Sequence, residues 1–240
     1  MERIDKIVSV AAGVSRTDAR ALIKKGLVSV NGAVVKNIGF KADEKSDVIC
    51  SRGEKLCYSK FVYIMMNKPK GVISASEGGS EKTVVDILPE NMKRKNLFPA
   101  GRLDKDTTGF VLITDDGDFA HKILSPKNHI PKTYIAKLDK PFDDTVVSAF
   151  EQGVELKDDL CMPAKISALY GDYRAAVVTI KQGMYHQIKR MFGKFGLTVV
   201  ELTRIKMGGL ELDKSLKPGE CRYITADELE QITAHCLRSE

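Results

Sequence analysis

Two kinds of hydrophobic pattern divide the chain. Near the N-terminus, apolar residues recur at helical spacing, and Ile4, Ile7, Val8, Ala11 and Ala12 form the stripe of an amphipathic helix. From residue 61 onward, short continuous apolar runs bounded by turn residues predict buried strands. The pattern therefore predicts an α+β protein, with a small module at the start and a larger body after it.

A second short helix of the module carries a basic face. Ser15 is a favourable N-cap residue, and Asp18 lies three positions later, near the positive end of the helix. Arg16, Arg20 and Lys24 recur every four residues and therefore share one outer face. Such a face is either an ordinary solvated helix surface or a surface that contacts phosphate groups.

A hairpin completes this module. Val28 and Val30 alternate as in a strand, and Asn31-Gly32 is the strongest short hairpin signal. Two helices and a small sheet with a basic helix face resemble the S4 RNA-binding domain, over Glu2 to Cys50. The resemblance implies that the basic face contacts RNA phosphates, which makes binding salt-sensitive but carries no sequence information directly.

Composition marks the domain boundaries. Residues 51–60, SRGEKLCYSK, are polar and interrupted by a glycine, and we interpret them as a linker. We therefore assign residues 1–50 to the RNA-binding domain, 61–233 to the body and 234–240 to a C-terminal tail.

Charge and cysteine usage narrow the class of protein. The net charge is +6, and residues 1–60 hold 12 Lys and Arg against 7 Asp and Glu, so one segment carries nearly all the excess. This favours a polyanionic partner. No apolar run approaches the ~20 residues of a membrane helix, and no secretory signal is apparent. The five scattered cysteines contain no CxxC pair, which indicates a reducing cytoplasm and neither a disulfide framework nor a zinc site.

The candidate chemistry centres on residues 101–117, GRLDKDTTGFVLITDDG. Arg102 and Asp104 precede the apolar run Phe110 to Ile113, so Asp104 is expected on a loop just ahead of a rigid core strand. In an extended segment the two charged residues lie on one side. Composition alone would also allow a surface ion pair in a polar turn.

The whole string closely resembles the catalytic signature of the pseudouridine synthases, in the branch that modifies ribosomal RNA. The match runs through GRLD, TTG and the closing DG. The resemblance implies that Asp104 is the catalytic carboxylate, and it places Arg102 where it would fill the gap left by a flipped base or hold a phosphate. It also implies a mostly antiparallel mixed β-sheet flanked by helices.

Two further motifs carry the same resemblance. Lys132-Thr133-Tyr134 is similar to the K-x-Y motif of the family, which implies that Tyr134 packs against the target base. Residues 182–196 contain Tyr185-His186-Gln187, whose His186 and Gln187 we expect to bind substrate. In the family, the basic residue that follows the H-Q-hydrophobic triplet pairs with the catalytic aspartate.

That basic residue is Lys189 here, where many relatives carry arginine; lysine keeps the charge but gives up bidentate geometry. The motif NKPKG at residues 67–71 also belongs to the resemblance. Its Lys68 and Lys70 either touch RNA or are merely solvated.

The resemblance implies the isomerisation of a uridine to pseudouridine. A carboxylate acts on the ribose or the base, a cation keeps it ionised, and an aromatic face holds the uracil, which must first be flipped out of the stack. We see no P-loop, no GxGxxG and no clustered His or Cys, so no metal or cofactor is expected. Tyr185-His186-Gln187 resembles the motif of the small-subunit enzymes of the family, and this resemblance favours 16S rRNA, with 23S rRNA as the alternative. We expect a monomer.

A rival interpretation is a non-catalytic rRNA-binding assembly factor built on an inactive synthase domain. The presence of Asp104, Tyr134 and Lys189 argues against it.

Overall fold

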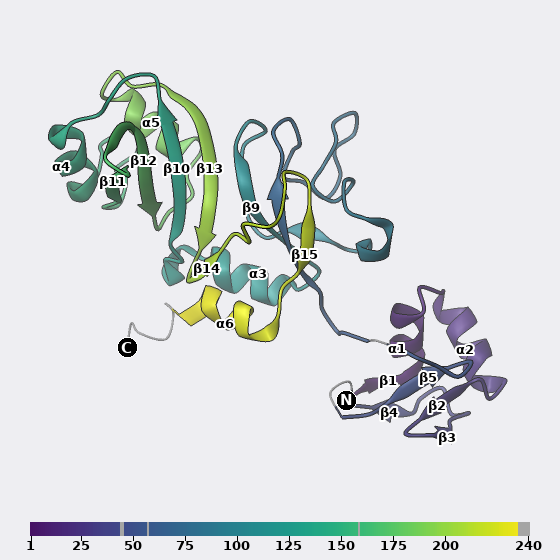
Figure 1. Cartoon of the computed structure of the whole chain (residues 1–240). Helices are drawn as coiled ribbons and strands as arrows, with labels where there is room; N and C mark the ends of the chain where they lie inside the picture. The colour runs from purple at the N-terminus through teal and green to yellow at the C-terminus, as the bar shows by residue number, and fades with distance from the viewer. Residues whose placement is uncertain (44–45, 57, 158, 235–240) are drawn as a thin grey trace. The chain divides into compact units, whose positions relative to one another are not determined.

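The fold is described from a computed structural model, which describes residues 1–43, 46–56, 58–157 and 159–234. Contacts divide the chain into two compact units, Met1–Phe61 and Val62–Glu240. Figure 1 shows the elements of each unit along the chain. Of the predicted C-terminal tail, only residue 234 lies within the described residues.

The first unit is a pair of helices on small sheets. Its helices are α1 (Ile4–Ala11) and α2 (Arg16–Lys24). Its strands are β1 (Glu2–Arg3), β2 (Val28–Val30), β3 (Ala33–Val34), β4 (Lys41–Ala42), β5 (Ile49–Ser51) and β6 (Glu54–Lys55). Strand β1 pairs with β4, and the other four form a sheet in the order β3-β2-β5-β6.

Local sequence accounts for these elements. The Ser15 side chain accepts a hydrogen bond from Asp18 N at 3.1 Å, so α2 is capped as the sequence predicts. Between β2 and β3, Asn31 (φ 51°) and Gly32 (φ 83°) both adopt positive φ, as a tight type I′ hairpin requires. The apolar stripe of α1 faces the unit's core, where Ile4, Ile7 and Val8 are fully buried.

The structure differs from the linker predicted at residues 51–60, because part of this segment belongs to the fold of the first unit. Ser51 belongs to β5 and pairs with Glu54 of β6, and Leu56 packs against the core of the first unit. Strands of two or three residues are too short to show a hydrophobic period, so this hairpin is not visible as a strand pattern.

In the described part of the second unit, nine strands form one sheet. They are β7 (Tyr63–Lys68), β8 (Phe98–Pro99), β9 (Thr108–Thr114), β10 (Lys132–Leu138), β11 (Lys165–Leu169), β12 (Asp172–Ile180), β13 (Val199–Met207), β14 (Leu210–Glu211) and β15 (Cys221–Tyr223). The main order is β11-β12-β10-β13-β9-β7-β15. Every pairing is antiparallel except that of β9 with β13, so the predicted mostly antiparallel mixed sheet is confirmed.

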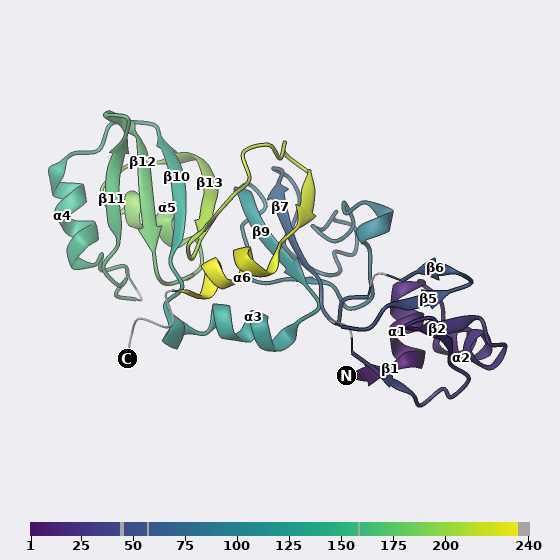
Figure 2. The ribbon, with the colours of Figure 1, turned by 60° about the horizontal axis from the view of Figure 1, so that its bottom comes forward.

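Helices cover this sheet. They are α3 (Gly117–Leu124), α4 (Asp144–Gln152), α5 (Gln187–Gly193) and α6 (Ala226–Thr233), with short 3-10 turns at Glu90–Met92 and Pro126–Asn128. In Figures 1 and 2, α3 and α6 lie side by side beneath the sheet, whereas α4 lies at its β11 end. Among the described helices of this unit, α3, α4 and α6 begin at a side-chain cap, from Asp116, Asp143 and Thr225.

The central strands are buried on both faces. In β9, Val111 and Ile113 join the larger core with α4 and α5, whereas Phe110 and Leu112 join a second core with α3 and α6. This explains why the sequence shows a continuous apolar run instead of an alternating one. The loop that precedes β9 is therefore anchored to a strand that is packed on both faces.

One glycine of the central motif is required by strand pairing. Gly109 has φ +96°, and a Cβ there would lie 2.2 Å from the carbonyl oxygen of Arg204 on β13. Any side chain would force the two parallel strands apart. Within the described residues, no helix has the length and apolar character needed to cross a membrane.

Candidate active site

The loop that carries Asp104 joins β8 to β9, and a buried lysine forms hydrogen bonds with its backbone. Lys68, at the end of β7, is completely buried, and its Nζ donates to the carbonyl oxygens of Asp104 (3.0 Å), Lys105 (3.2 Å) and Thr107 (2.8 Å). A fourth contact goes to the carbonyl of Pro69 at 3.2 Å. Three backbone carbonyls of one loop thus converge on a single ammonium group.

The two alternatives given for Lys68 are therefore both wrong, because it is neither solvated nor exposed to RNA. Burial lowers the pKa of its ammonium to about 8, and the carboxylates of Asp106 and Asp104 oppose the shift. The group is protonated at neutral pH and keeps three N–H donors for the loop. Lys70, two residues later, is exposed.

Other contacts fix the same loop. Ser74 exchanges hydrogen bonds of 3.1 Å with the backbone N–H and carbonyl of Leu103, and Gly71 N donates to Lys105 O at 2.8 Å. Lys105 also forms an ion pair with Glu81. The aspartate is thus displayed from a loop whose backbone is restrained on both sides of it.

The Asp104 carboxylate meets a cation from α5. Lys189 Nζ lies 3.1 Å from Asp104 Oδ2 and 2.7 Å from Asp106 Oδ1, so one ammonium bridges two carboxylates. His186 Nε2 lies 3.5 Å from the same Asp104 oxygen. The structure therefore brings Lys189 to the aspartate with which the family resemblance pairs it.

Asp106 is a partner that the sequence analysis missed. The hydrogen bond from Lys189 lowers the pKa of the Asp106 carboxyl. Burial alone would lower the pKa of Lys189, but the carboxylates of Asp106 and Asp104 raise it above its usual value. The signal was present in the sequence as two aspartates two positions apart in GRLDKD. The arrangement keeps a positive charge beside Asp104 throughout the neutral pH range.

A large open cleft of about 1220 Å³ borders the loop that carries Asp104. Its lining includes Arg102, Asp104, Tyr134 and His186. Tyr134 comes from β10 and is largely buried, whereas the Arg102 side chain is exposed. A smaller hollow of about 70 Å³ joins Asp104 and Tyr134 with Gln187. A planar base bound there would contact the carboxylate and the phenol together.

The motif residues next to Lys189 differ in their surroundings. Tyr185 is 75% exposed, and its ring stacks on that of His186 with centroids 3.9 Å apart. Gln187 is buried; its Oε1 accepts a hydrogen bond from Met184 N, and its Nε2 donates one to Gln182 Oε1, both at 3.2 Å. Gln187 therefore stabilises the turn at residues 182–187 and lines the smaller hollow, whereas His186 lines the large cleft.

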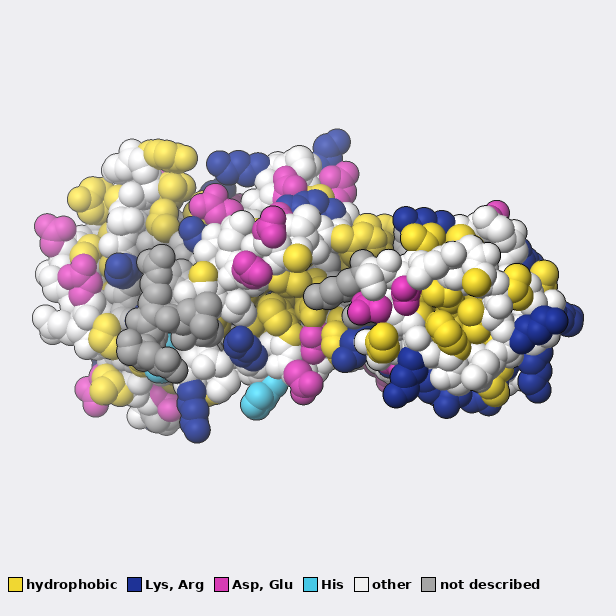
Figure 3. Space-filling view, turned by 90° about the horizontal axis from the view of Figure 1, so that it is seen from below, with side chains coloured by type: hydrophobic (Ala, Val, Ile, Leu, Met, Phe, Trp, Pro, Cys, Tyr) yellow, Lys and Arg dark blue, Asp and Glu magenta, His cyan; other side chains and the backbone are white. Residues whose placement is uncertain are grey.

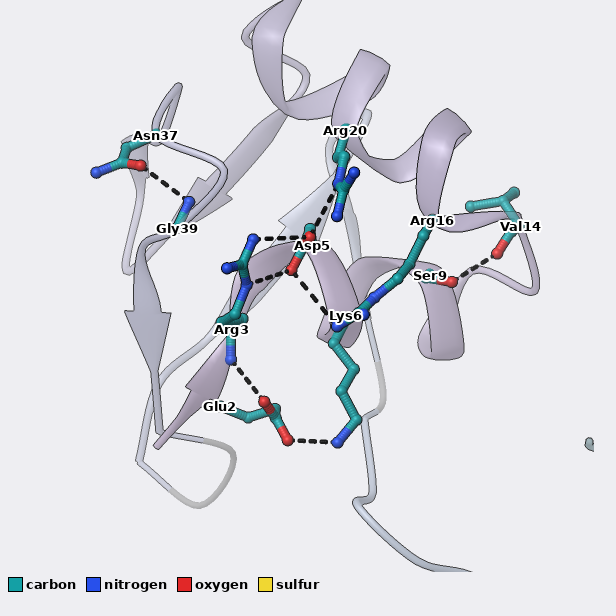
Figure 4. Close-up of polar contacts among 10 residues, drawn as sticks. All are labelled: Glu2, Arg3, Asp5, Lys6, Ser9, Val14, Arg16, Arg20, Asn37 and Gly39. Carbon is teal, nitrogen blue, oxygen red and sulfur yellow. Dashed lines mark hydrogen bonds and ion pairs between the residues drawn. The ribbon is translucent and has the colours of Figure 1, made fainter. Parts of the chain in front are cut away.

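The basic face of the first unit is organised by a buried carboxylate. Asp5 of α1 is 0% exposed, and Arg20 Nε lies 3.1 Å from it, Arg3 Nε 3.0 Å and Arg16 Nη2 3.9 Å (Figure 4). The hydrogen bonds of Arg3 and then Arg20 lower the pKa of Asp5. Arg16 and Arg20 are thus positioned by an internal anion while remaining about half exposed.

Lysine and arginine side chains gather along the edge of the first unit in the space-filling view (Figure 3). Lys24, the third residue of the predicted face, is exposed at the end of α2. RNA contact by this face stays a prediction. Among the described residues, no group of three or more His, Cys, Asp or Glu side chains is placed to hold a metal ion.

These features match one family of RNA-modifying enzymes. The RNA pseudouridylate synthase family matches residues 62–194, and the S4 domain family matches residues 2–49. The chain belongs to the RNA pseudouridylate synthase family and is an isomerase with an N-terminal S4 domain.

Individual relatives agree. The chain is 40% identical to the ribosomal small subunit pseudouridine synthase A of Vibrio vulnificus, over 96% of this chain and 99% of that protein. It is 39% identical to the Escherichia coli protein of the same name, with the same coverage, and 41% identical to an uncharacterised RNA pseudouridine synthase of Bacillus subtilis, over 95% and 96%. A solved pseudouridylate synthase superposes with a TM-score of 0.67 and 36% identity, over 97% of this chain and 100% of that one.

Proposed function

We propose that this protein converts one uridine of 16S ribosomal RNA to pseudouridine, with Asp104 as the catalytic carboxylate. The observation that carries the proposal is the placement of Asp104 in the cleft beside Lys189 (3.1 Å), with Tyr134 lining the same hollow. A fixed carboxylate, a cation and an aromatic surface are the groups that this isomerisation needs.

The reaction balances without an outside reactant. The bond between N1 of uracil and C1′ of ribose breaks, the uracil turns, and a bond forms between C5 and C1′. The hydrogen of C5 leaves as a proton and N1 gains one. Asp104 acts on the sugar or on the ring, Lys189 stabilises its negative charge, and Tyr134 keeps the detached base stacked in place. No cofactor takes part in this scheme.

The base must leave the RNA stack to reach Asp104, which costs a few kcal/mol. Arg102 is exposed at the cleft. Its side chain can fill the space that the flipped base leaves, or its guanidinium can bind a phosphate. His186 Nε2 lies 3.5 Å from Asp104 Oδ2, and the His186 side chain also lines the cleft.

The assignment to 16S rRNA rests on two observations. The third motif reads Tyr185-His186-Gln187, which resembles the small-subunit enzymes, and relatives of about 40% identity over nearly the whole chain carry small-subunit names. A uridine of 23S rRNA is the alternative substrate. We also propose that the enzyme works as a monomer in the cytoplasm, where its substrate is made.

Mapping pseudouridine in both ribosomal subunits of a deletion strain tests the substrate. We expect one position of 16S rRNA to lose its modification and to regain it when the wild-type chain is expressed. Loss from 23S rRNA alone would contradict the 16S assignment and keep the activity. Unchanged maps in both subunits would contradict the proposed rRNA substrate.

The S4 face should contribute to RNA affinity in a salt-dependent way. Lys24→Gln is expected to reduce the slope of log K against log salt by about 0.7 to 0.9, the loss of one phosphate contact. Measuring RNA binding from low to physiological salt checks this. Lys24 is preferable to Arg20, whose removal would deprive the buried Asp5 of a partner.

The matched control is Lys25→Gln, because it makes the same change in net charge at the adjacent position. Lys25 is exposed at the C-cap of α2, turned about the helix axis from Lys24. Equal slope changes in both variants would mean that general charge, and not this helix face, attracts RNA.

A further inference from the structure

Two cations lie on the sheet beside Tyr134 with no role in the scheme above. Lys132 begins β10, two residues before Tyr134, and Arg204 of β13 is the register partner of Tyr134. Residues two apart on a strand point to the same face, as do directly paired residues on neighbouring strands. Both side chains line the large cleft.

Arg204 is buried without satisfying its guanidinium. The residue is 2% exposed, and its Nε donates to the carbonyl of Phe110 at 2.7 Å. Its Nη2 is buried and has no hydrogen-bond partner. Buried donors in native proteins are nearly always paired, so an orphaned nitrogen of a charged group at a cleft indicates a ligand.

Lys132 has the same deficit. In the part of the chain that the structure describes, no ion pair or hydrogen bond joins its ammonium to another residue. Burial lowers its pKa to about 8, and the nearby charge of Arg204 adds to the lowering. Two desolvated cations therefore repel each other at the edge of the site.

The other lysines of the site differ in this respect. Lys189 bridges the carboxylates of Asp104 and Asp106, and Lys68 is surrounded by four carbonyl oxygens. Those two cations are compensated within the protein. The positive charge of Lys132 and Arg204 is instead left for something that enters the cleft.

We propose that Lys132 and Arg204 form a phosphate subsite, which binds a phosphodiester group of the RNA strand next to the nucleotide whose base packs on Tyr134. This inference rests on the proposed function, because it places the RNA in the same cleft. Phosphate oxygens accept charge-assisted hydrogen bonds from a guanidinium and pair with an ammonium as a point charge. Lys132 and Tyr134 are about 7 Å apart along β10, so base and phosphate of one short segment can be held together.

A neutral oxygen of uracil fits this site less well. It would satisfy the orphaned N–H of Arg204, but it would leave two neighbouring positive charges uncompensated. An anion accepts a hydrogen bond from the orphaned N–H of Arg204 and also neutralises the two neighbouring positive charges.

Salt-dependent RNA binding by full-length Lys132→Gln tests the subsite. The probe is a single-stranded RNA oligonucleotide that contains the modified uridine, and no turnover is needed. We expect the slope of log K against log salt to fall by about 0.7, so that a fourfold rise in salt weakens the variant about 2.6-fold less than wild type. The matched control is Lys165→Gln on β11, an exposed lysine outside the cleft, which should keep the wild-type slope.

Inorganic phosphate provides a second measurement. It should raise the melting temperature of the wild type and of Lys165→Gln, and raise that of Lys132→Gln much less. Arg204→Lys, which retains one charge in the buried position, should reduce this shift partially. Because Lys132 is only partly buried, its variant is expected to fold and carries the test if Arg204→Lys does not.

Three other results would each contradict the proposed phosphate subsite. Identical slopes for Lys132→Gln and the control exclude an RNA phosphate, and a lost phosphate effect with an unchanged RNA slope means a site for free phosphate. A lower kcat with an unchanged slope means contact with uracil. The proposed function fails separately, if wild-type protein binds RNA with the expected slope but forms no pseudouridine.

Discussion

Replacing Asp104 by asparagine is expected to lower the rate of pseudouridine formation by roughly 10⁴- to 10⁶-fold, the range seen when an essential reacting group is removed. Asparagine has nearly the same shape but neither the charge nor the nucleophilicity of the carboxylate. The loop should stay in place, because Lys68 holds it through backbone carbonyls and not through the Asp104 side chain. RNA affinity should therefore change little.

The matched control is Asp106→Asn, the same substitution two residues away in the same loop. Asp106 shares Lys189 with Asp104 but is 58% exposed, so its ion pair contributes little. We expect less than about a tenfold loss of rate, measured as release of label from RNA tritiated at uracil C5. If Asp106→Asn were as inactive as Asp104→Asn, the role assigned to Asp104 alone would be wrong.

Replacing Lys68 by methionine should have the second largest effect. The change leaves the carbonyls of Asp104, Lys105 and Thr107 without their shared donor, at a cost of about 1–3 kcal/mol for each that stays buried and unpaired. A displacement of the catalytic loop by about 1 Å can reduce the rate about 10²-fold. We therefore expect a lower urea midpoint and a fall in kcat of at least that size.

The neighbouring Lys70→Met provides the control, because it removes the same charge from an exposed position in the same motif. It should retain the wild-type urea midpoint and kcat, with at most a modest change in KM for RNA. A fully active Lys68→Met protein would show that the buried ammonium does not position the loop.

The sequence predicted much of the fold because the fold depends on local rules. The apolar spacing of α1, the Ser15 cap of α2 and the Asn31-Gly32 hairpin each follow from one short segment. The uninterrupted apolar run of β9 correctly indicated a buried strand, and the structure shows that this strand is buried on both faces. The β5–β6 hairpin was missed because strands of two or three residues carry no period.

The site required information that no single segment contains. Lys68 resembles a turn lysine beside a proline, and its partners lie 36 to 39 residues later along the chain. One signal was available: Ile64, Met66 and Lys68 share the side of β7 that faces the larger core, so the charge stands at a core position. Arg204, on the same side of β13 as Leu202, carries the same signal.

Family resemblance supplied what spacing could not. Asp104, Tyr134 and Lys189 come from a loop, a strand and a helix; only the fold places Asp104 and Tyr134 in one cleft, with Lys189 3.1 Å from the Asp104 carboxylate. The pairing of Lys189 with two carboxylates, and the unpaired charges of Lys132 and Arg204, depend on side-chain geometry, so residue order marks the candidate residues but does not assign their partners.

The most direct measurement is a map of pseudouridine in the ribosomal RNA of a deletion strain that expresses either the wild-type chain or Asp104→Asn at equal level. The wild type should restore the missing pseudouridine, and the asparagine variant should leave that uridine unmodified. Restoration by both proteins would contradict the assignment of the chemistry to this carboxylate.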